Sequence, residues 1–302
     1  MASTSDSKFS LMEWGAIWSV VLVWGVNNAA AKFATASLPP MLIGGVRFAV
    51  ALAFLFPFIK PPFPAWRTFV PVLLLLGPLH FGVVYWGFSL AHNLSLFSVT
   101  LQLWIPLTAL FSWMILREAM PRLSLAGMAV AFAGVAYMTL DPRTAGDVKA
   151  VLVGVCASTI WALGTVLVRR MPQARPLKVQ ACISLVAAPT LLTMSLLTEP
   201  HVVERARAAS WAVWTSIGYA GLVSSVGATV FLFWLVQRRE AGRFTPYLLA
   251  TPLITSALGV ALFHDVLTAR LIGGGLATLV GVALVALAER RRTRSAIELE
   301  VS

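Results

Sequence analysis

Two adjacent asparagines, Asn27 and Asn28, interrupt a long apolar run near the start of the sequence. A buried amide without a hydrogen-bond partner costs ~2–7 kcal/mol in an apolar medium. Trp24 precedes the pair by three and four positions, so it shares their face if the run is helical. We expect Trp24, Asn27 and Asn28 to line a polar cavity. The alternative is hydrogen bonding between helices, which stabilises by a modest ~0.6–2 kcal/mol.

His80 is a titratable side chain near the middle of a second apolar run, in "GPLHFGVVYWG". We interpret it as a polar contact for a bound small molecule. A neutral histidine that only fixes packing is the alternative, and a role in proton transfer has less support. Gly77, Pro78 and Gly82 flank it and permit bending of the helix.

Gln102 lies four residues before Pro106. A proline frees the carbonyl four positions before it, so we expect the Gln102 carbonyl to be an unpaired acceptor beside its own side-chain amide. Pro252 occupies the corresponding place later in the chain, with Tyr247 nearby. We expect both kinks to shape a cavity; the alternative is that they only bend their helices.

Trp161, with Ser158 and Thr165 at helical spacing, forms another face with a large aromatic ring and hydroxyl groups. We expect Trp161 and Thr165 to contact the same bound molecule, or else Trp161 packs against lipid or protein.

Arg47 lies about two turns inside an apolar run, where a charge costs at least ~2.5–3.5 kcal/mol. We interpret Arg47 as structural, and contact with a substrate carboxylate is the alternative.

The composition requires a membrane environment for these residues. Of the 302 residues, 59% are hydrophobic and only 12% are charged, whereas a soluble domain carries about 25% charged residues. The net charge of +11 is scattered between apolar runs, so it does not indicate nucleic-acid binding. No zinc-ligand spacing, nucleophile motif or carboxylate pair occurs, so we expect neither an enzyme nor a cofactor.

The apolar runs predict an all-α membrane protein with ten spanning helices, since a helix needs ~20 apolar residues to cross a bilayer. On the side that carries both termini lie 16 of the 23 Lys and Arg residues. Because basic loops stay in the cytoplasm, we expect both termini to be cytoplasmic. The expected spans start near Glu13, Pro40, Phe69, Ser95, Leu123, Val148, Pro176, Trp211, Phe244 and Arg270.

The two halves of the chain repeat a set of residues in the same order. Each half has a tryptophan (Trp24, Trp161) and then a proline (Pro106, Pro252). An acidic residue follows, Glu118 or Asp265, with glycines nine and sixteen positions beyond it. These matches predict two five-helix repeats, 1–145 and 146–302. Because five is odd, the second repeat is inverted and the pair encloses a central cavity, as in transporters.

Small and charged residues at the helix ends give two further expectations. Gly273, Ala277 and Gly281 form a ridge that lets helices approach closely. We expect another helix of the same chain as the partner, and a monomer rather than a dimer. We expect the two repeated acids, Glu118 and Asp265, to orient loops or to pair with Arg122 and Arg270, rather than to move protons.

The sequence resembles the EamA-type permeases of the drug/metabolite transporter superfamily. The resemblance rests on "LIGGVRFAVALAF", on "REAMPRLSLAGMAVAFAGV" and on its second copy "HDVLTARLIGGGLATLVGV". "WGVNNAAAK" is most similar to the aromatic amino-acid exporter branch. The resemblance implies a central cavity built by spans one to four and six to nine, with spans five and ten as packing supports.

We therefore expect a transporter in the bacterial inner membrane that exports aromatic and other neutral amino acids by alternating access. All 12 acidic residues lie in tails, loops or span ends, which favours facilitated transport over ion-driven transport. The alternatives are a proton-driven exporter of another small amphipathic metabolite or drug, an intramembrane enzyme and, third, a channel. The expected substrate-binding residues are Trp24, Asn27, Asn28, His80, Gln102, Trp161, Thr165 and Tyr247.

Overall fold

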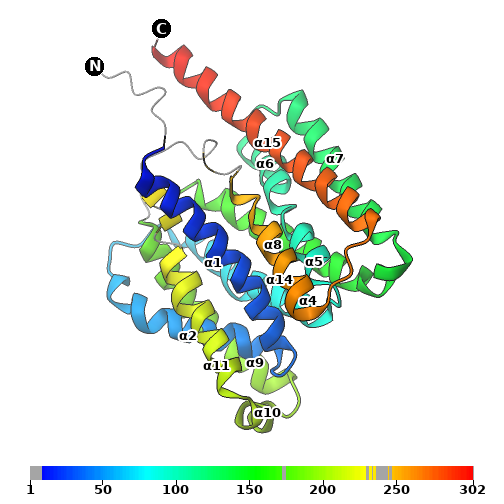
Figure 1. Cartoon of the computed structure of the whole chain (residues 1–302). Helices are drawn as coiled ribbons and strands as arrows, with labels where there is room; N and C mark the ends of the chain where they lie inside the picture. Colours follow the sequence, from blue (N-terminus) through cyan, green and yellow to red (C-terminus); the bar gives the residue numbers. More distant parts are fainter. Residues whose placement is uncertain are drawn as a thin grey trace.

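A computed structural model describes residues 9–171, 175–228, 231–232, 234–235, 244 and 247–301, and within these ranges every regular element is a helix (Figure 1). The all-α class is therefore confirmed for the described part of the chain. In chain order the elements are α1 (Leu11–Thr35), α2 (Pro40–Leu55), η1 (Phe56–Phe58), α3 (Trp66–Leu74), η2 (Leu75–Leu79), α4 (His80–Leu90), α5 (Leu94–Leu101), α6 (Trp104–Leu116), α7 (Arg122–Thr139), η3 (Pro142–Asp147), α8 (Val148–Val168), α9 (Pro176–Thr198), α10 (Val202–Ala208), α11 (Trp211–Tyr219), η4 (Ala220–Ala228), α14 (Thr251–Phe263) and α15 (Ala269–Val301).

Seven helical runs among the described residues are long and apolar enough to cross a membrane. α1 has the required length, 25 residues, but Asn27 and Asn28 make it less apolar than these seven. The predicted starts agree with the observed ones to within a turn wherever the structure describes them, and the start near Phe244 falls mostly outside the described residues. The seven runs are Pro40–Phe58, Trp66–Leu90, Leu94–Leu116, Arg122–Thr139, Val148–Val168, Pro176–Thr198 and Ala269–Ala288, with Thr251–Phe263 as a shorter apolar helix.

The helices pack in pairs that join distant parts of the sequence. α2 packs along α9, α5 against α14, and α7 along α15, and the last pair lies side by side in Figure 1. α1 contacts α14 and η4, while α8 contacts α4, α6 and η2. Each of these contacts joins a helix of the first half of the chain to one of the second half.

The α7–α15 pair approaches closely through glycine, as the small-residue ridge predicts. A Cβ on Gly134 would lie 2.5 Å from the Gly274 carbonyl oxygen, and one on Gly127 would lie 2.6 Å from that of Gly281. The partner is another helix of the same chain, as expected. The prediction is correct for Gly281, which meets Gly127, but wrong for Gly273, which is exposed while Gly274 is buried. Spacing alone identified the stripe of small residues but not which neighbour faces α7.

The same irregularities occur in both halves of the chain. π-Helical turns interrupt the third long run at η2 and the run after α11 at η4. α6 and α14, each 13 residues long, end in a left-handed residue, Arg117 (φ 54°) and His264 (φ 58°). The repeated acid follows immediately in each case, so the spacing found in the sequence corresponds to a repeated local structure.

Candidate functional site

The third helical run changes geometry directly before His80. Within η2, Gly77 has non-helical dihedral angles (φ −106°, ψ −109°) and is followed by Pro78, which has no N–H to donate. A Cβ on Gly77 would lie 3.2 Å from Ala187 and 3.3 Å from Ile183, so this turn packs tightly against α9. The break therefore fixes the position of His80, the first residue of α4.

His80 joins α4 to α8 through a hydrogen bond and ring contacts. Its Nδ1 lies 2.9 Å from the Ala157 carbonyl oxygen. A carbonyl only accepts, so Nδ1 carries the hydrogen, and in the neutral ring Nε2 is left as an acceptor. The His80 ring centroid lies 4.7 Å from that of Trp161 and 4.8 Å from that of Phe81. Two predicted site residues, His80 and Trp161, are thus in direct contact.

Arg47 also contacts Phe81 and is buried, with 6% of its surface exposed. Its Nε donates to Ser225 Oγ at 2.9 Å and its Nη1 to the Tyr85 hydroxyl at 3.2 Å. Its Nη2 approaches Ser224 Oγ at 3.5 Å, and its Cζ lies 4.6 Å from the Phe81 ring centroid. The guanidinium is held between α2, α4 and the π-helical η4, all by neutral groups.

The two asparagines differ in their hydrogen bonding, and Asn28 forms the predicted bonds between helices. Asn28 Nδ2 donates to Thr255 Oγ1 at 3.2 Å and approaches Ser98 Oγ at 3.5 Å, so this amide links α1 to α14 and α5. Asn27 is buried, and its Oδ1 has no hydrogen-bond partner. Trp24 is half-buried and packs against the apolar cluster that includes Leu248. Among the described residues, Asn27 Oδ1 is one of three buried side-chain oxygens without a partner, with Ser195 Oγ and Thr251 Oγ1.

Gln102 does not present the free carbonyl that the sequence predicts. The chain turns between α5 and α6, and the Gln102 carbonyl accepts from the Ile105 N–H at 3.1 Å. The expected unpaired acceptor was wrong because a tight turn before Pro106 supplies a new donor three residues on. The Gln102 side chain remains half-buried.

The side chains of Thr165 and Tyr247 make other contacts and do not join the ring contact between His80 and Trp161. The Thr165 hydroxyl donates to the Trp161 carbonyl at 2.8 Å, a bond within its own helix. The Tyr247 ring lies 4.9 Å from Trp14 and 6.0 Å from Phe9, which places it beside the start of α1. The structure thus brings His80 and Trp161 together and leaves Tyr247 in a separate aromatic group.

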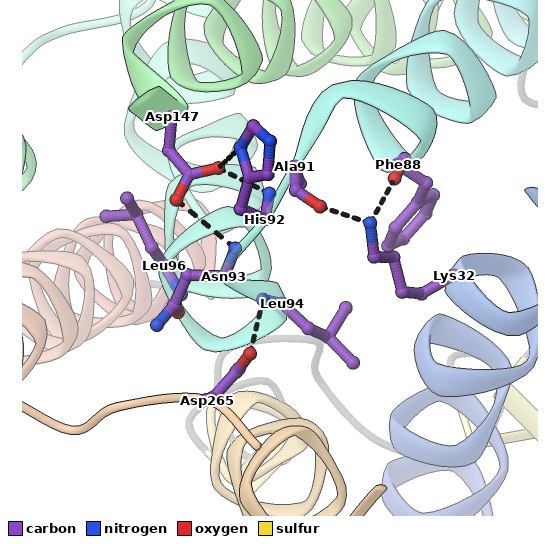
Figure 2. A network of polar contacts seen from close by, with 9 residues as sticks. All are labelled: Lys32, Phe88, Ala91, His92, Asn93, Leu94, Leu96, Asp147 and Asp265. Carbon is purple, nitrogen blue, oxygen red and sulfur yellow. Dashed lines mark hydrogen bonds and ion pairs between the residues drawn. The ribbon is translucent and has the colours of Figure 1, made fainter. Parts of the chain in front are cut away.

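A second polar network closes the turn between α4 and α5 (Figure 2). Asp147 and Asp265 are both buried there, with 3% and 8% of their surfaces exposed. Carboxylates at a helix N-terminus satisfy donors that have no partner within the helix. Together they accept from four successive backbone N–H groups, those of His92, Asn93, Leu94 and Ser95.

Lys32 completes this network from α1. Its Nζ donates to the Phe88 carbonyl at 3.2 Å and to the Ala91 carbonyl, at the C-terminal end of α4 (Figure 2). A cation is favourable there because the last carbonyls of a helix carry partial negative charge. The sequence does not reveal that Lys32 caps the end of α4 and Asp147 the start of α5, because the groups that they bind lie 54 to 59 residues away in the chain.

The predicted arginine partners of the repeated acids need correction. Asp265 caps α5, whereas Arg270 donates to the Leu140 carbonyl at 2.7 Å, so the expected pair does not form. Glu118 pairs with Arg169, at the end of α8, at 3.3 Å. Tertiary contacts thus supply donors to both acids from distant parts of the chain.

Within the described residues no cluster of three or more His, Cys, Asp or Glu side chains could hold a metal ion. The site instead combines apolar helices of spanning length, helix breaks in both halves, an aromatic cluster and a buried cation. These features are those of a multi-pass membrane protein.

The family model of the EamA-like transporter family matches residues 13–140 and again residues 148–287. The chain belongs to this family and is a membrane transporter. It is 27% identical over 292 residues to an uncharacterized transporter, YvbV, of Bacillus subtilis, covering 92% of each chain. It is 26% identical over 280 residues to a probable amino-acid metabolite efflux pump of Salmonella typhimurium, covering 87% of this chain and 91% of that one.

Two further matches agree with this assignment. An uncharacterized inner membrane transporter of Escherichia coli, YedA, is 21% identical over 263 residues, covering 84% of each chain. A solved crystal structure superposes with a TM-score of 0.64 at 19% identity, covering 93% of this chain and 98% of that one. The second match shows that the fold is shared.

Proposed function

We propose that the protein exports aromatic and other neutral amino acids across the bacterial inner membrane by alternating access. The carrying observation is the contact of His80 with Trp161 and Phe81, at the end of a π-helical break in a spanning run. Unwound or π-helical backbone inside a membrane helix is typical of ligand sites. The relative named an amino-acid metabolite efflux pump supports the choice of substrate class.

Alternating access requires two units that move against each other, and we propose that these are inverted repeats, 1–145 and 146–302. The helix contacts occur in matching pairs. α1 packs on α14 as α8 packs on α6, and α1 packs on η4 as α8 packs on η2. α2 likewise packs on η4 as α9 packs on η2. The double match of the family model supports the same division.

We propose that both termini are cytoplasmic, because the basic residues are concentrated in the loops on that side. The start of α1 and the end of α15 lie toward the same end of the molecule, which supports a shared side (Figure 1). Several of the basic residues in that count, Arg238, Arg239 and Arg243 among them, lie outside the described residues. The turn held by Asp147 and Asp265 then faces the periplasm.

The chemistry of the cluster suits an amino acid with an apolar side chain. The Trp161 and Phe81 rings are half-buried, so they retain surface against which a substrate ring could stack. Nε2 of neutral His80 is an acceptor for an ammonium group. The other predicted residues, Trp24, Asn27, Asn28, Gln102, Thr165 and Tyr247, remain predictions, of which Asn27 has the strongest support through its unpaired oxygen.

The test is efflux and counterflow of labelled phenylalanine from vesicles that contain only the purified protein. Trp161→Ala should raise the half-saturation concentration about two- to tenfold, since one aromatic contact is worth about 0.5–1.5 kcal/mol. His80→Leu should impair transport, and His80→Gln should retain part of it because its amide can both donate and accept. Trp211→Ala is the control, because that ring is 79% exposed at a helix start.

The same vesicles separate the alternatives. A proton-driven exporter of another metabolite would require a pH gradient, and an enzyme would return a chemically altered solute. Unchanged phenylalanine moving without a gradient supports facilitated transport. Equal transport by wild-type and by the Trp161 and His80 variants would refute the proposed site.

A further inference from the structure

Arg47 carries a positive charge that the described protein does not neutralise. It sits midway along α2, with 6% of its surface exposed, so it cannot reach water. All of its partners, Ser224, Ser225, Tyr85 and Phe81, are uncharged. In the part of the chain that the structure describes, none of the ion pairs includes Arg47.

The carboxylate that binds α2, the helix of Arg47, is committed elsewhere. Glu199 accepts from the Met41 and Leu42 N–H groups at 2.8 and 3.3 Å, at the N-terminus of α2, well over a turn before Arg47. Asp147 and Asp265 cap α5. An isolated buried charge is expensive, so a packing role alone would be served better by a neutral side chain.

The Arg47 guanidinium keeps two N–H groups that the described residues do not engage. It has five N–H groups, and three hydrogen bonds engage one on each nitrogen. One N–H therefore remains on each terminal nitrogen, the number that a bidentate carboxylate requires. Its orientation is fixed by the two serines of η4, and by Tyr85 and Phe81 of α4. A preorganised arginine of this kind matches carboxylate geometry better than a flexible lysine does.

Phe81 contacts both this cation and the His80 ring. The Phe81 centroid lies 4.6 Å from Arg47 Cζ and 4.8 Å from the His80 ring centroid. Arg47, Phe81, His80 and Trp161 thus form one continuous set of contacts. A cation, an acceptor nitrogen and an aromatic ring are the groups that the carboxylate, the ammonium and the side chain of an amino acid require.

We propose that Arg47 binds the carboxylate of the transported molecule and so makes a free carboxylate a requirement for transport. The inference rests on the proposed transport function and specifies its substrate class: small monocarboxylates with an apolar body, amino acids among them. Ser224 and Ser225 orient the guanidinium from the other half of the chain, so the bound carboxylate joins both halves.

The first experiment uses the wild-type protein in detergent and measures the rise in unfolding temperature with four probes. These are phenylalanine, 3-phenylpropionate, phenylalaninamide and phenethylamine, which share the ring and differ in carboxylate and amine. We expect stabilisation by the first two at concentrations at least tenfold lower than by the last two, because a bond to a charged group is worth about a factor of ten or more. Equal stabilisation by phenylalaninamide would overturn the proposal.

The second experiment measures competition by the same probes against labelled phenylalanine in vesicles. Arg47→Gln should abolish the preference for carboxylates over the amide, and Arg47→Lys should restore part of it. Arg205→Gln is the control, since that exposed arginine only donates to the Ser37 carbonyl. A folded Arg47→Gln variant that keeps the tenfold preference would assign Arg47 a purely structural role.

The outcomes separate this inference from the proposed function. Stabilisation by 3-phenylpropionate without any transport of phenylalanine would retain the carboxylate site and refute amino-acid export. Transport of phenylalanine and phenylalaninamide at equal rates would retain export and refute the role of Arg47. If Arg47→Gln does not fold, the four probes measured on the wild-type protein still test whether binding requires a carboxylate.

Discussion

Replacing Asp265 by asparagine tests the buried cap that joins the two halves of the chain. Asp265 accepts from the Leu94 N–H at 3.2 Å, and from both the N–H and the hydroxyl of Ser95 at 2.7 Å. Asparagine has the same shape, so it fits beside Gly259, where no side chain could be added. It has one carbonyl oxygen in place of two carboxylate oxygens, and its NH₂ would face a backbone donor.

The expected cost follows from these three bonds. At least one buried N–H loses its partner, at about 1–3 kcal/mol, and the remaining bonds lose their charge assistance. We expect a loss of about 3 kcal/mol in the free energy of unfolding. Each kcal/mol shifts the Tm of a chain of this size by roughly 2 °C, so the Tm should fall by about 6 °C.

Thermal unfolding in detergent, followed by tryptophan fluorescence, measures this difference. The control is Glu204→Gln in α10, whose carboxylate is 74% exposed and pairs with an exposed histidine. An exposed pair of this kind contributes at most about 1 kcal/mol. If both variants lose the same small amount, the carboxylate does not stabilise the α4–α5 turn and the reasoning fails.

Two other pairs of substitutions probe the packing of the helices by the same assay. Gly134→Ala places a Cβ 2.5 Å from a carbonyl of α15 and should lower the free energy of unfolding by about 1–3 kcal/mol. Its control is Gly15→Ala, whose Cβ meets nothing within 4 Å and which should raise the free energy of unfolding by about 0.5–1 kcal/mol through helix propensity. Equal effects would contradict the close α7–α15 contact. Asn28→Leu should cost ~0.6–2 kcal/mol by removing an interhelical bond, whereas Asn27→Leu should leave stability unchanged or higher because its oxygen is already unpaired. A larger loss for Asn27→Leu would show that the oxygen has a partner.

The tertiary structure gives the repeated residues different tasks from those that spacing suggests. Spacing marked Glu118 and Asp265 as equivalent and predicted local arginine partners. Asp265 instead reaches a helix start 170 residues away in sequence, because a helix N-terminus offers several aligned donors while an exposed arginine offers one solvated charge. The spacing in the sequence shows that the two acids occupy equivalent positions, but it does not show which groups they bind.

The candidate site shows the same division. His80 and Trp161 stood out in the sequence because polar and large aromatic groups are costly or unusual within apolar runs. Their contact depends on the packing of α4 against α8. Arg47 was interpreted as structural, since nothing in the sequence shows that its surroundings contain only hydroxyls and an aromatic ring.

By itself the sequence determined the membrane environment, the positions of most helices and the repetition between the halves. Each of these follows from hydropathy and residue order, which are properties of short segments. Only the tertiary structure decided which glycine faces α7, which donors the buried acids satisfy and which side chains surround Arg47. These depend on how helices distant in sequence rotate and pack, and a rotation of one residue about a helix axis changes the side chain that meets its neighbour.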